Sequence, residues 1–223
     1  MYVNVVINQN CIKLKDMSES ELYQEYTPKS ITLIPLHRRD LFRILGGGLY
    51  VFYQISNPFE VLSADAEQRR SLPSDYNAFL WIAENGEVSC MTGKIEMGQG
   101  IVTSLAQMLA DELNVPMKKV KMVMGDTELC PWDAGTYGSL TTRAFSPFMR
   151  AAAAEARAVL LEMAAEKLKS TVDELTVSDG IVFVKSSPNK KISYGELTKG
   201  QKIERFLDEK PVIKDYSEFK IMG

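Results

Sequence analysis

The sequence predicts an α+β fold in which a mixed β-sheet with two β-hairpins packs against two main helices. Asn-Gly and Asp-Gly pairs between strand-like runs indicate the hairpins, and two longer stretches with helical periodicity indicate the helices. A strand follows the helix that follows the first hairpin, an order typical of a mixed sheet with helices packed on it. The chain has 223 residues, enough to bury a substantial core.

The composition is that of a globular protein and argues against several functions. A formal net charge of −3, without a basic stripe, argues against nucleic acid as a partner. Cys11, Cys90 and Cys130 are far apart and odd in number, which fits neither a disulfide framework nor a metal site. His37 is the only histidine, so a catalytic triad or a histidine-rich metal site is nearly excluded.

The N-terminal third contains possible export signals. Residues 1–37 are expected to form a disordered tail, and residues 67–76 a linker. Over residues 38–66, an arginine pair and a glycine-rich apolar run resemble a twin-arginine signal, and Ala64-Asp65-Ala66 is a small-x-small cleavage site. We therefore expect export to the periplasm; the alternative is an amphipathic helix with a basic start. The apolar run is too short and glycine-rich for a stable membrane span.

The folded domain is predicted over residues 77–200, and its first half alternates strands with a helix. Asn85-Gly86 should form the first hairpin turn, because both residues tolerate positive φ. Apolar residues at helical spacing then precede Pro116, which should end the helix. The predicted elements are strands over residues 79–82 and 88–92, a helix over residues 101–113 and a strand over residues 120–124.

The second half of the domain should begin with the longest helix, with Ser146 as its N-cap and Pro147 at its first position. A second hairpin is predicted around Asp179-Gly180, between strands of residues 175–178 and 181–185. Capping residues at Thr171 and Ser193 should each start a short helical segment. Residues 201–223 have no periodicity and are expected to form a C-terminal tether.

Two glycine-containing stretches are the candidate binding elements. In residues 93–100, the backbone must turn sharply before a helix whose unpaired amides and dipole could hold an anion. A plain connection is the more common alternative for such a turn. Residues 127–142 form a loop rich in glycine and hydroxyl groups, which suits a phosphate. The alternative is that these hydroxyls bond to their own backbone.

These stretches carry a resemblance to a known family, over nearly the whole chain from about Arg38 to Gly223. The family is that of the molybdopterin-binding large subunits of xanthine dehydrogenases and aldehyde oxidases, and the nearest resemblance is to the isoquinoline 1-oxidoreductase beta-subunit type. In that type, too, a twin-arginine signal precedes the domain. The motifs that resemble the family are Glu96-Met97-Gly98-Gln99-Gly100, Val123-Met124-Gly125-Asp126-Thr127 and Gly135-Thr136-Tyr137-Gly138-Ser139.

The resemblance implies a cofactor site for molybdopterin, as its cytosine dinucleotide, shared with segments absent from this chain. The glutamine of the first motif would contact the cofactor between two glycines that permit close approach, and the hydroxyl-rich loop would meet its phosphates or nucleotide. The pterin's own dithiolene sulfurs would hold molybdenum, so no protein metal ligand is expected. The implied cofactor-binding residues are Gly98, Gln99, Gly100, Gly138, Ser139 and Thr141.

The resemblance also implies that this chain is the N-terminal part of a molybdenum hydroxylase large subunit, because family subunits are considerably longer. Its partners would be the remainder of that subunit and an iron–sulfur subunit. The complete enzyme would hydroxylate an aldehyde or N-heterocycle with oxygen from water. The family's catalytic glutamate lies beyond this chain and Glu96 does not match it, so no catalytic residue is expected here.

Two alternatives remain. The first is a non-catalytic truncated relic or interaction module with the same fold. The second is a nucleotide-binding protein unrelated to molybdenum, which is weaker because the sequence has neither a Gly-Lys-Thr/Ser phosphate loop nor a Gly-x-Gly-x-x-Gly turn.

Overall fold

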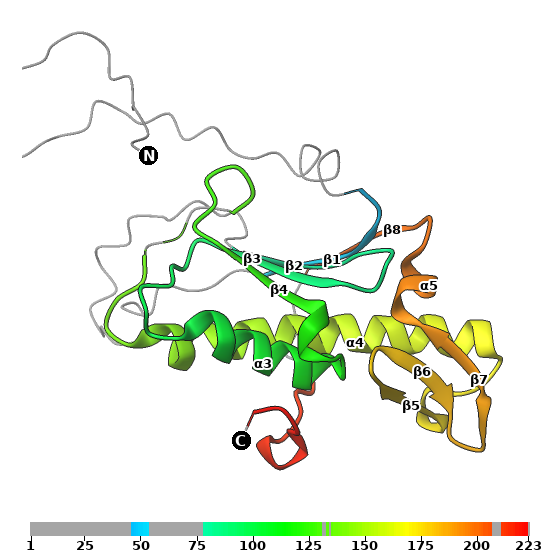
Figure 1. Cartoon of the computed structure of the whole chain (residues 1–223). Helices are drawn as coiled ribbons and strands as arrows, with labels where there is room; N and C mark the ends of the chain where they lie inside the picture. Colours follow the sequence, from blue (N-terminus) through cyan, green and yellow to red (C-terminus); the bar gives the residue numbers. More distant parts are fainter. Residues whose placement is uncertain (1–45, 54–77, 131–132, 134, 207–210, 223) are drawn as a thin grey trace, which may run out of the picture. The chain divides into compact units, whose positions relative to one another are not determined.

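The computed structural model describes residues 46–53, 78–130, 133, 135–206 and 211–222. These residues belong to one unit, Leu36–Gly223, and form the expected α+β fold (Figure 1). A five-stranded sheet packs on two main helices, and a separate three-stranded sheet lies beside one end of the longer helix. The helices are α3 (Ile101–Leu113), α4 (Ser146–Leu168) and the short α5 (Tyr194–Thr198).

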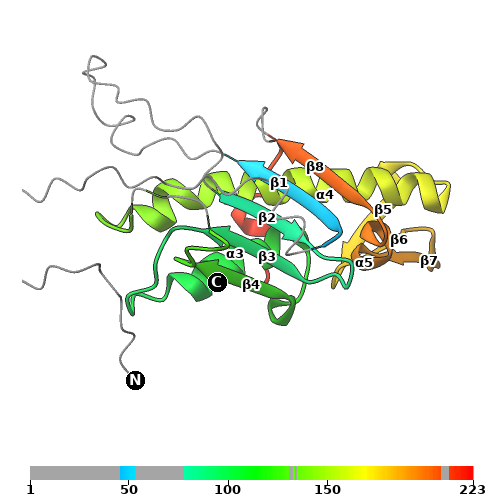
Figure 2. The same ribbon diagram turned by 90° about the horizontal axis from the view of Figure 1, so that it is seen from above.

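The larger sheet is mixed, with strand order β4-β3-β2-β1-β8 (Figure 2). The β1–β2 and β2–β3 pairs are antiparallel, whereas β3–β4 and β1–β8 are parallel. The hairpin predicted at Asn85-Gly86 is confirmed as β2–β3. The strands are β1 (Gly48–Tyr53), β2 (Ala78–Ile82), β3 (Val88–Thr92), β4 (Val120–Met124) and β8 (Lys202–Phe206).

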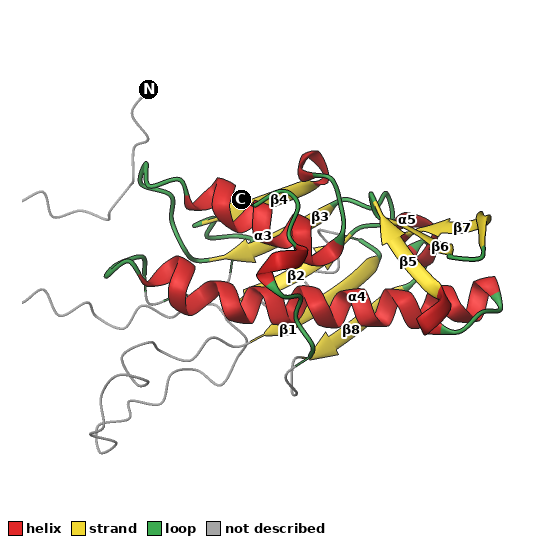
Figure 3. Cartoon of the chain, turned by 90° about the horizontal axis from the view of Figure 1, so that it is seen from below, coloured by secondary structure: helices red, strands yellow, loops and turns green. Residues whose placement is uncertain are grey.

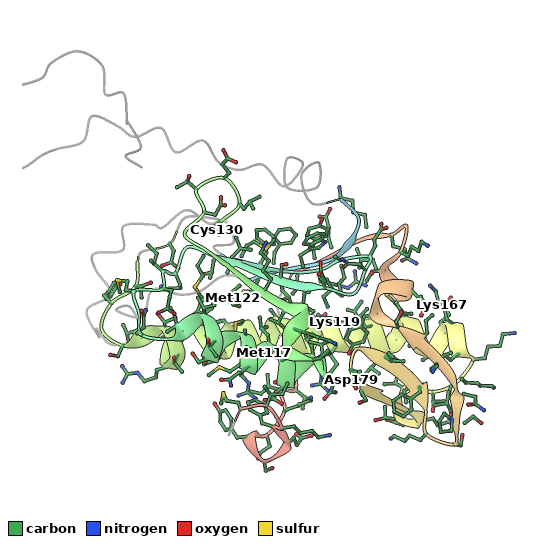
Figure 4. The ribbon with its side chains drawn as sticks, viewed as in Figure 1. Met117, Lys119, Met122, Cys130, Lys167 and Asp179 are labelled. Atoms are coloured by element: carbon green, nitrogen blue, oxygen red, sulfur yellow. The ribbon has the colours of Figure 1, made fainter. Side chains whose placement is uncertain are left out.

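Helices α3 and α4 cover one face of this sheet (Figure 3). The main core lies between them and the sheet, with Leu49, Leu105 and Met149 among its buried residues. A smaller aromatic cluster around Tyr50 and Phe79 lies on the opposite face. Cys130 packs against that cluster from the loop after β4 (Figure 4). Among the described helices, none is long and apolar enough to cross a membrane.

Strand β1 lies inside the sheet, although it falls within the stretch expected to be a signal, residues 38–66. Leu49, Tyr50 and Val51 have no exposed surface, and β1 pairs with β2 on one side and β8 on the other. The folded domain therefore begins before residue 77. An alternation of aliphatic and aromatic residues, buried on both faces of a sheet, has a composition close to that of a signal's apolar core. The arginine pair and the cleavage site lie outside the described residues.

The C-terminal stretch, residues 201–223, is not the tether that its lack of periodicity suggested. Its first part is β8, and residues 211–222 are anchored to the last turn of α3. The Asp111 carboxylate accepts the backbone N–H groups of Lys220 at 2.8 Å, Ile221 at 3.1 Å and Met222 at 2.9 Å. These hydrogen bonds depend on a partner about a hundred residues earlier, so no local pattern could reveal them.

A buried ionic network joins α3, α4 and the same C-terminal segment. The Glu112 side chain has no exposed surface and accepts Arg157 Nη2 at 3.0 Å and Arg150 Nη2 at 3.3 Å. It also accepts the backbone N–H of Lys214 at 3.1 Å. The Arg150 guanidinium lies over two aromatic rings of the segment, 4.6 and 4.8 Å from their centroids. One buried carboxylate thus links three parts of the fold.

The longest helix begins earlier than predicted. A π-helical turn, Thr141–Phe145, leads directly into α4. Ser146 is therefore not an N-cap: its backbone is helical, and its hydroxyl donates to the Thr142 carbonyl. Pro147 has no N–H to donate, and the π-helical turn just before it already interrupts the regular ladder. The predicted hydroxyl-rich loop correspondingly ends at Leu140.

The smaller sheet confirms the second predicted hairpin and adds a strand that was not expected. Its strands are β5 (Leu175–Ser178), β6 (Ile181–Val184) and β7 (Ser187–Ser193). β7 was missed because its first five residues are all exposed and mostly polar. The caps expected at Thr171 and Ser193 are both present, and each is part of a capping box.

We predict that Glu112→Gln destabilises the fold by about 3–5 kcal/mol, because Arg150 and Arg157 then lose their buried counter-charge. Urea denaturation measures the change. The control, Glu162→Gln on the exposed face of α4, should change stability by less than about 0.5 kcal/mol. Equal effects of the two substitutions would contradict the structural role of the network.

A chain that begins at Glu67 should not fold cooperatively. It lacks β1, and with it the strand between β2 and β8. A chain that begins at Leu36 keeps β1 and is the control. Circular dichroism during heating should show a cooperative transition only for the control. A cooperative transition at the same temperature for both chains would show that β1 is dispensable.

Candidate cofactor-binding site

The first candidate stretch joins β3 to α3 as predicted, and two of its three glycines have positive φ. Gly98 has φ +94° and Gly100 has φ +79°, values that L-residues with a side chain rarely adopt. A Cβ at either position would meet no atom within 4 Å. The backbone at both glycines therefore borders open space, where a ligand could approach closely.

Three amides at and just before the start of α3 already donate to the chain's own Glu96. Glu96 Oε1 accepts Gly98 N–H at 2.8 Å and Gly100 N–H at 2.9 Å, while Oε2 accepts Val102 N–H at 3.0 Å. These bonds, with that from Val102 the strongest influence, hold the pKa of Glu96 below its usual value. The expectation that an anionic ligand group could settle at this helix start is corrected, because a carboxylate occupies it.

Gln99 folds back over its own loop. Its Oε1 accepts Met97 N–H at 2.5 Å, and its Nε2 donates to Ile95 O at 3.1 Å. An amide nitrogen carries two hydrogens, so the second Nε2–H has no hydrogen-bond partner among the described residues. Gln99 is exposed at the loop surface and can offer this one donor to a ligand.

The two candidate stretches lie side by side. Lys94 Nζ donates to Asp133 Oδ1 at 2.7 Å and to Gly135 O at 2.7 Å. One residue further, Ile95 N–H donates to Thr136 Oγ1 at 2.8 Å. Sequence reasoning missed the Lys94–Asp133 pair, because 39 residues separate its members and neither has a local motif. The pair nevertheless fixes the position of one predicted stretch against the other.

The remaining predicted residues divide into two groups. Gly138 and Ser139 are exposed in a left-handed turn, with φ +61° and +53°. They are accessible to a ligand on the side of the loop that faces solvent. Thr141 is only 5% exposed and lies in the π-helical turn, where it lines a small hollow together with Lys94 and Tyr137. The site therefore presents Ser139 and the Gly138 backbone more directly than Thr141.

Apolar side chains surround these polar groups. Four large hydrophobic residues of the two stretches and of α3 are exposed: Ile95 (49%), Met97 (68%), Val102 (37%) and Tyr137 (38%). Such exposed apolar surface beside open backbone is typical of a binding site and not of a plain connection. Among the described residues, no group of three His, Cys, Asp or Glu side chains could hold a metal ion. The arrangement can bind and orient a ligand.

The donor set fits a pterin cofactor. A single amide N–H, accessible glycine backbone and a hydroxyl are suitable partners for a polar ring system with phosphate substituents. A family model described as the molybdopterin cofactor-binding domain matches residues 37–219, which include both stretches. The chain therefore belongs to the molybdopterin cofactor-binding domain family, as found in xanthine dehydrogenases and aldehyde oxidases.

Three relatives show the range of this similarity. A nicotinate dehydrogenase subunit of Pseudomonas putida is 34% identical over 145 residues, 65% of this chain and 12% of that protein. The membrane-bound aldehyde dehydrogenase (pyrroloquinoline-quinone) of Gluconacetobacter polyoxogenes is 32% identical over 188 residues, 80% of this chain and 23% of that protein. The beta subunit of isoquinoline 1-oxidoreductase from Brevundimonas diminuta is 28% identical over 128 residues, 54% of this chain and 16% of that protein. The chain thus spans less than a quarter of each relative.

We predict that Asp133→Ala destabilises the fold by about 3 kcal/mol, because the ammonium group of Lys94, a residue that is only 9% exposed, then loses its counter-charge. Urea denaturation measures the loss. Asp173→Ala removes an exposed carboxylate from the short turn after α4 and should cost less than about 0.5 kcal/mol. If Asp133→Ala is equally mild, the loop is not held by this pair.

Proposed function

We propose that this chain forms one wall of the molybdopterin site in a molybdenum hydroxylase large subunit. The observation that carries the proposal is the pairing of the two glycine-containing stretches through Lys94 and Ile95. This pairing gathers accessible backbone, an amide donor and a hydroxyl at one edge of the site. The match to the cofactor-binding family supports the same function.

The proposed roles follow from what each group exposes. The outward Nε2–H of Gln99 would donate to an acceptor on the cofactor, and Gly98 and Gly100 would let the cofactor approach the backbone. Ser139 and the Gly138 amide would contact a phosphate or the nucleotide of a cytosine dinucleotide form, and Thr141 would contribute from the adjacent hollow. The bound cofactor would supply the redox chemistry, while these residues hold and orient it.

The complete enzyme would act on an aldehyde or an N-heterocycle, with electrons passing to an iron–sulfur subunit. The names of two relatives contain the N-heterocycles nicotinate and isoquinoline, and that of a third contains an aldehyde. One of these names carries pyrroloquinoline quinone as cofactor, so the names do not agree on the chemistry. The family match favours molybdopterin. The isoquinoline 1-oxidoreductase beta-subunit type remains our proposal for the closer relationship.

Export to the periplasm is also proposed, on the arginine pair and small-x-small site within residues 38–66. β1 lies between these two cues and is buried in the sheet, so cleavage after Ala66 would remove a strand of the fold. The intact mass of the exported chain would show whether this cleavage takes place.

We predict that Gln99→Ala and Ser139→Ala each lower molybdenum retention about three- to tenfold, the equivalent of one lost hydrogen bond. The tagged chain would be expressed in the organism that encodes it, grown with molybdate, and purified together with its associated subunits. Molybdenum would be measured by mass spectrometry, and the released nucleotide identified in the same sample. The controls are Gln107→Ala on α3 and Ser187→Ala on β7, which lie outside the site.

Molybdenum retention separates this function from the alternative, a non-catalytic module with the same fold. In such a module, the two site substitutions should change nothing except stability, by less than about 1 kcal/mol for exposed residues. A wild-type complex that contains no molybdenum under molybdate-replete conditions would refute the proposed function.

A further inference from the structure

We propose that Glu96 is a positioning residue: it excludes phosphate from the start of α3 and holds Gln99 so that a single amide donor faces the ligand. This inference rests on the proposed function for the identity of the ligand. The hydrogen bonds that support it lie within this chain.

Hydrogen bonds to Glu96 hold the backbone on both sides of Gln99. Glu96 Oε1 accepts from Gly98 and Gly100, the residues directly before and after Gln99, at 2.8 and 2.9 Å. The backbone on both sides of Gln99 is thus tied to one oxygen atom. Through Oε2, the same carboxylate is tied to Val102 in the first turn of α3 at 3.0 Å. The position of the Gln99 side chain is therefore set relative to the helix.

The side chain of Gln99 is itself held by hydrogen bonds to its own loop. Its oxygen accepts from Met97 and one of its two N–H groups donates to Ile95, so the amide plane is fixed at both ends. Only the second N–H can be offered outward. The natural match for that group is a hydrogen-bond acceptor such as a ring carbonyl or an oxo group. A phosphate, which needs several donors, is a poor match.

The negative charge of Glu96 also disfavours a phosphate at the start of α3. A phosphate at the start of α3 would find the amides of Gly98, Gly100 and Val102 already bonded and would lie beside the Glu96 carboxylate. The cation nearest in sequence, Lys94, is paired with Asp133 at 2.7 Å. The phosphates of the ligand must then lie toward Gly138 and Ser139, with its non-phosphate part at Gln99. Glu96 thereby determines the orientation in which the ligand binds across the site.

The test is a pH titration of backbone amide signals by NMR, with the full chain. In the wild type, the Gly98, Gly100 and Val102 amides should shift together, with one midpoint below the ordinary value for glutamate. Glu96→Gln should abolish this shared titration and displace the Gln99 side-chain amide signals. The matched control is Glu174→Gln, which alters another capping carboxylate whose pKa is also lowered, by the Ser170 hydroxyl first. It should leave the Gln99 signals unchanged.

Inorganic phosphate is the second probe, added at constant ionic strength. The three amide signals should not move in the wild type and should move saturably in Glu96→Ala, which frees the amides. Equal responses in the two proteins would overturn the exclusion of phosphate. Independent titration of the three wild-type amides would overturn the shared carboxylate, even if a Glu96 variant did not fold.

A third readout connects this inference to the cofactor. Glu96→Gln should lower molybdenum retention about as much as Gln99→Ala does, whereas Glu174→Gln should not lower it. Retention equal to wild type in Glu96→Gln would overturn the positioning role. The two NMR experiments need no cofactor, so their failure is distinguishable from failure of the proposed function, which a molybdenum-free wild-type complex would show.

Discussion

The buried carboxylate of Glu112 is the interaction on which the arrangement of helices depends. It lies at the end of α3, without exposed surface, and faces two arginines of α4. A lone buried charge would be very unfavourable, so the carboxylate and the guanidinium groups must be buried together or not at all. The relative position of α3 and α4 is therefore narrowly defined at this point.

The same network also orders the C-terminal segment. Asp111, next to Glu112, binds three successive backbone N–H groups of that segment, and Arg150 lies over the rings of Tyr216 and Phe219. Backbone groups of a segment without regular structure need partners when they are buried, and two neighbouring acids supply them. An aperiodic sequence thus becomes ordered because of residues on a distant helix.

The site lies at the opposite end of α3 from this network. Since Glu112 fixes α3 against α4 and the sheet holds both helices, the start of α3 and the π-helical turn before α4 have defined positions. The Lys94–Asp133 pair then joins the loops that precede these two helices. The site is built in this order, from the helix pair to the loops, and a ligand would find its donors already placed.

Local signals in the sequence were sufficient for elements whose cause is local. The turn at Asn85-Gly86 and the helix over residues 101–113 follow from positive φ and from apolar spacing, and both are confirmed. Strand β1 was missed because its apolar residues fit a signal as well as a buried strand. β8 and residues 211–222 were missed because their order comes from partners far away in sequence, above all β1, Asp111 and Glu112.

Glu96 shows why a glycine turn before a helix does not by itself define a phosphate site. The glycines and the helix start were correctly identified as a place where amides gather, yet an acid lies four residues before Gly100. An acid so close to a helix start can accept hydrogen bonds from those amides itself, and these bonds lower the pKa of its carboxyl group. Glycine then serves to admit the ligand, while the acid determines which of its groups can approach. In this loop the Glu96 carboxylate occupies the position where an anionic ligand group would bind, and the side-chain amide of Gln99 remains as the hydrogen-bond donor to the ligand.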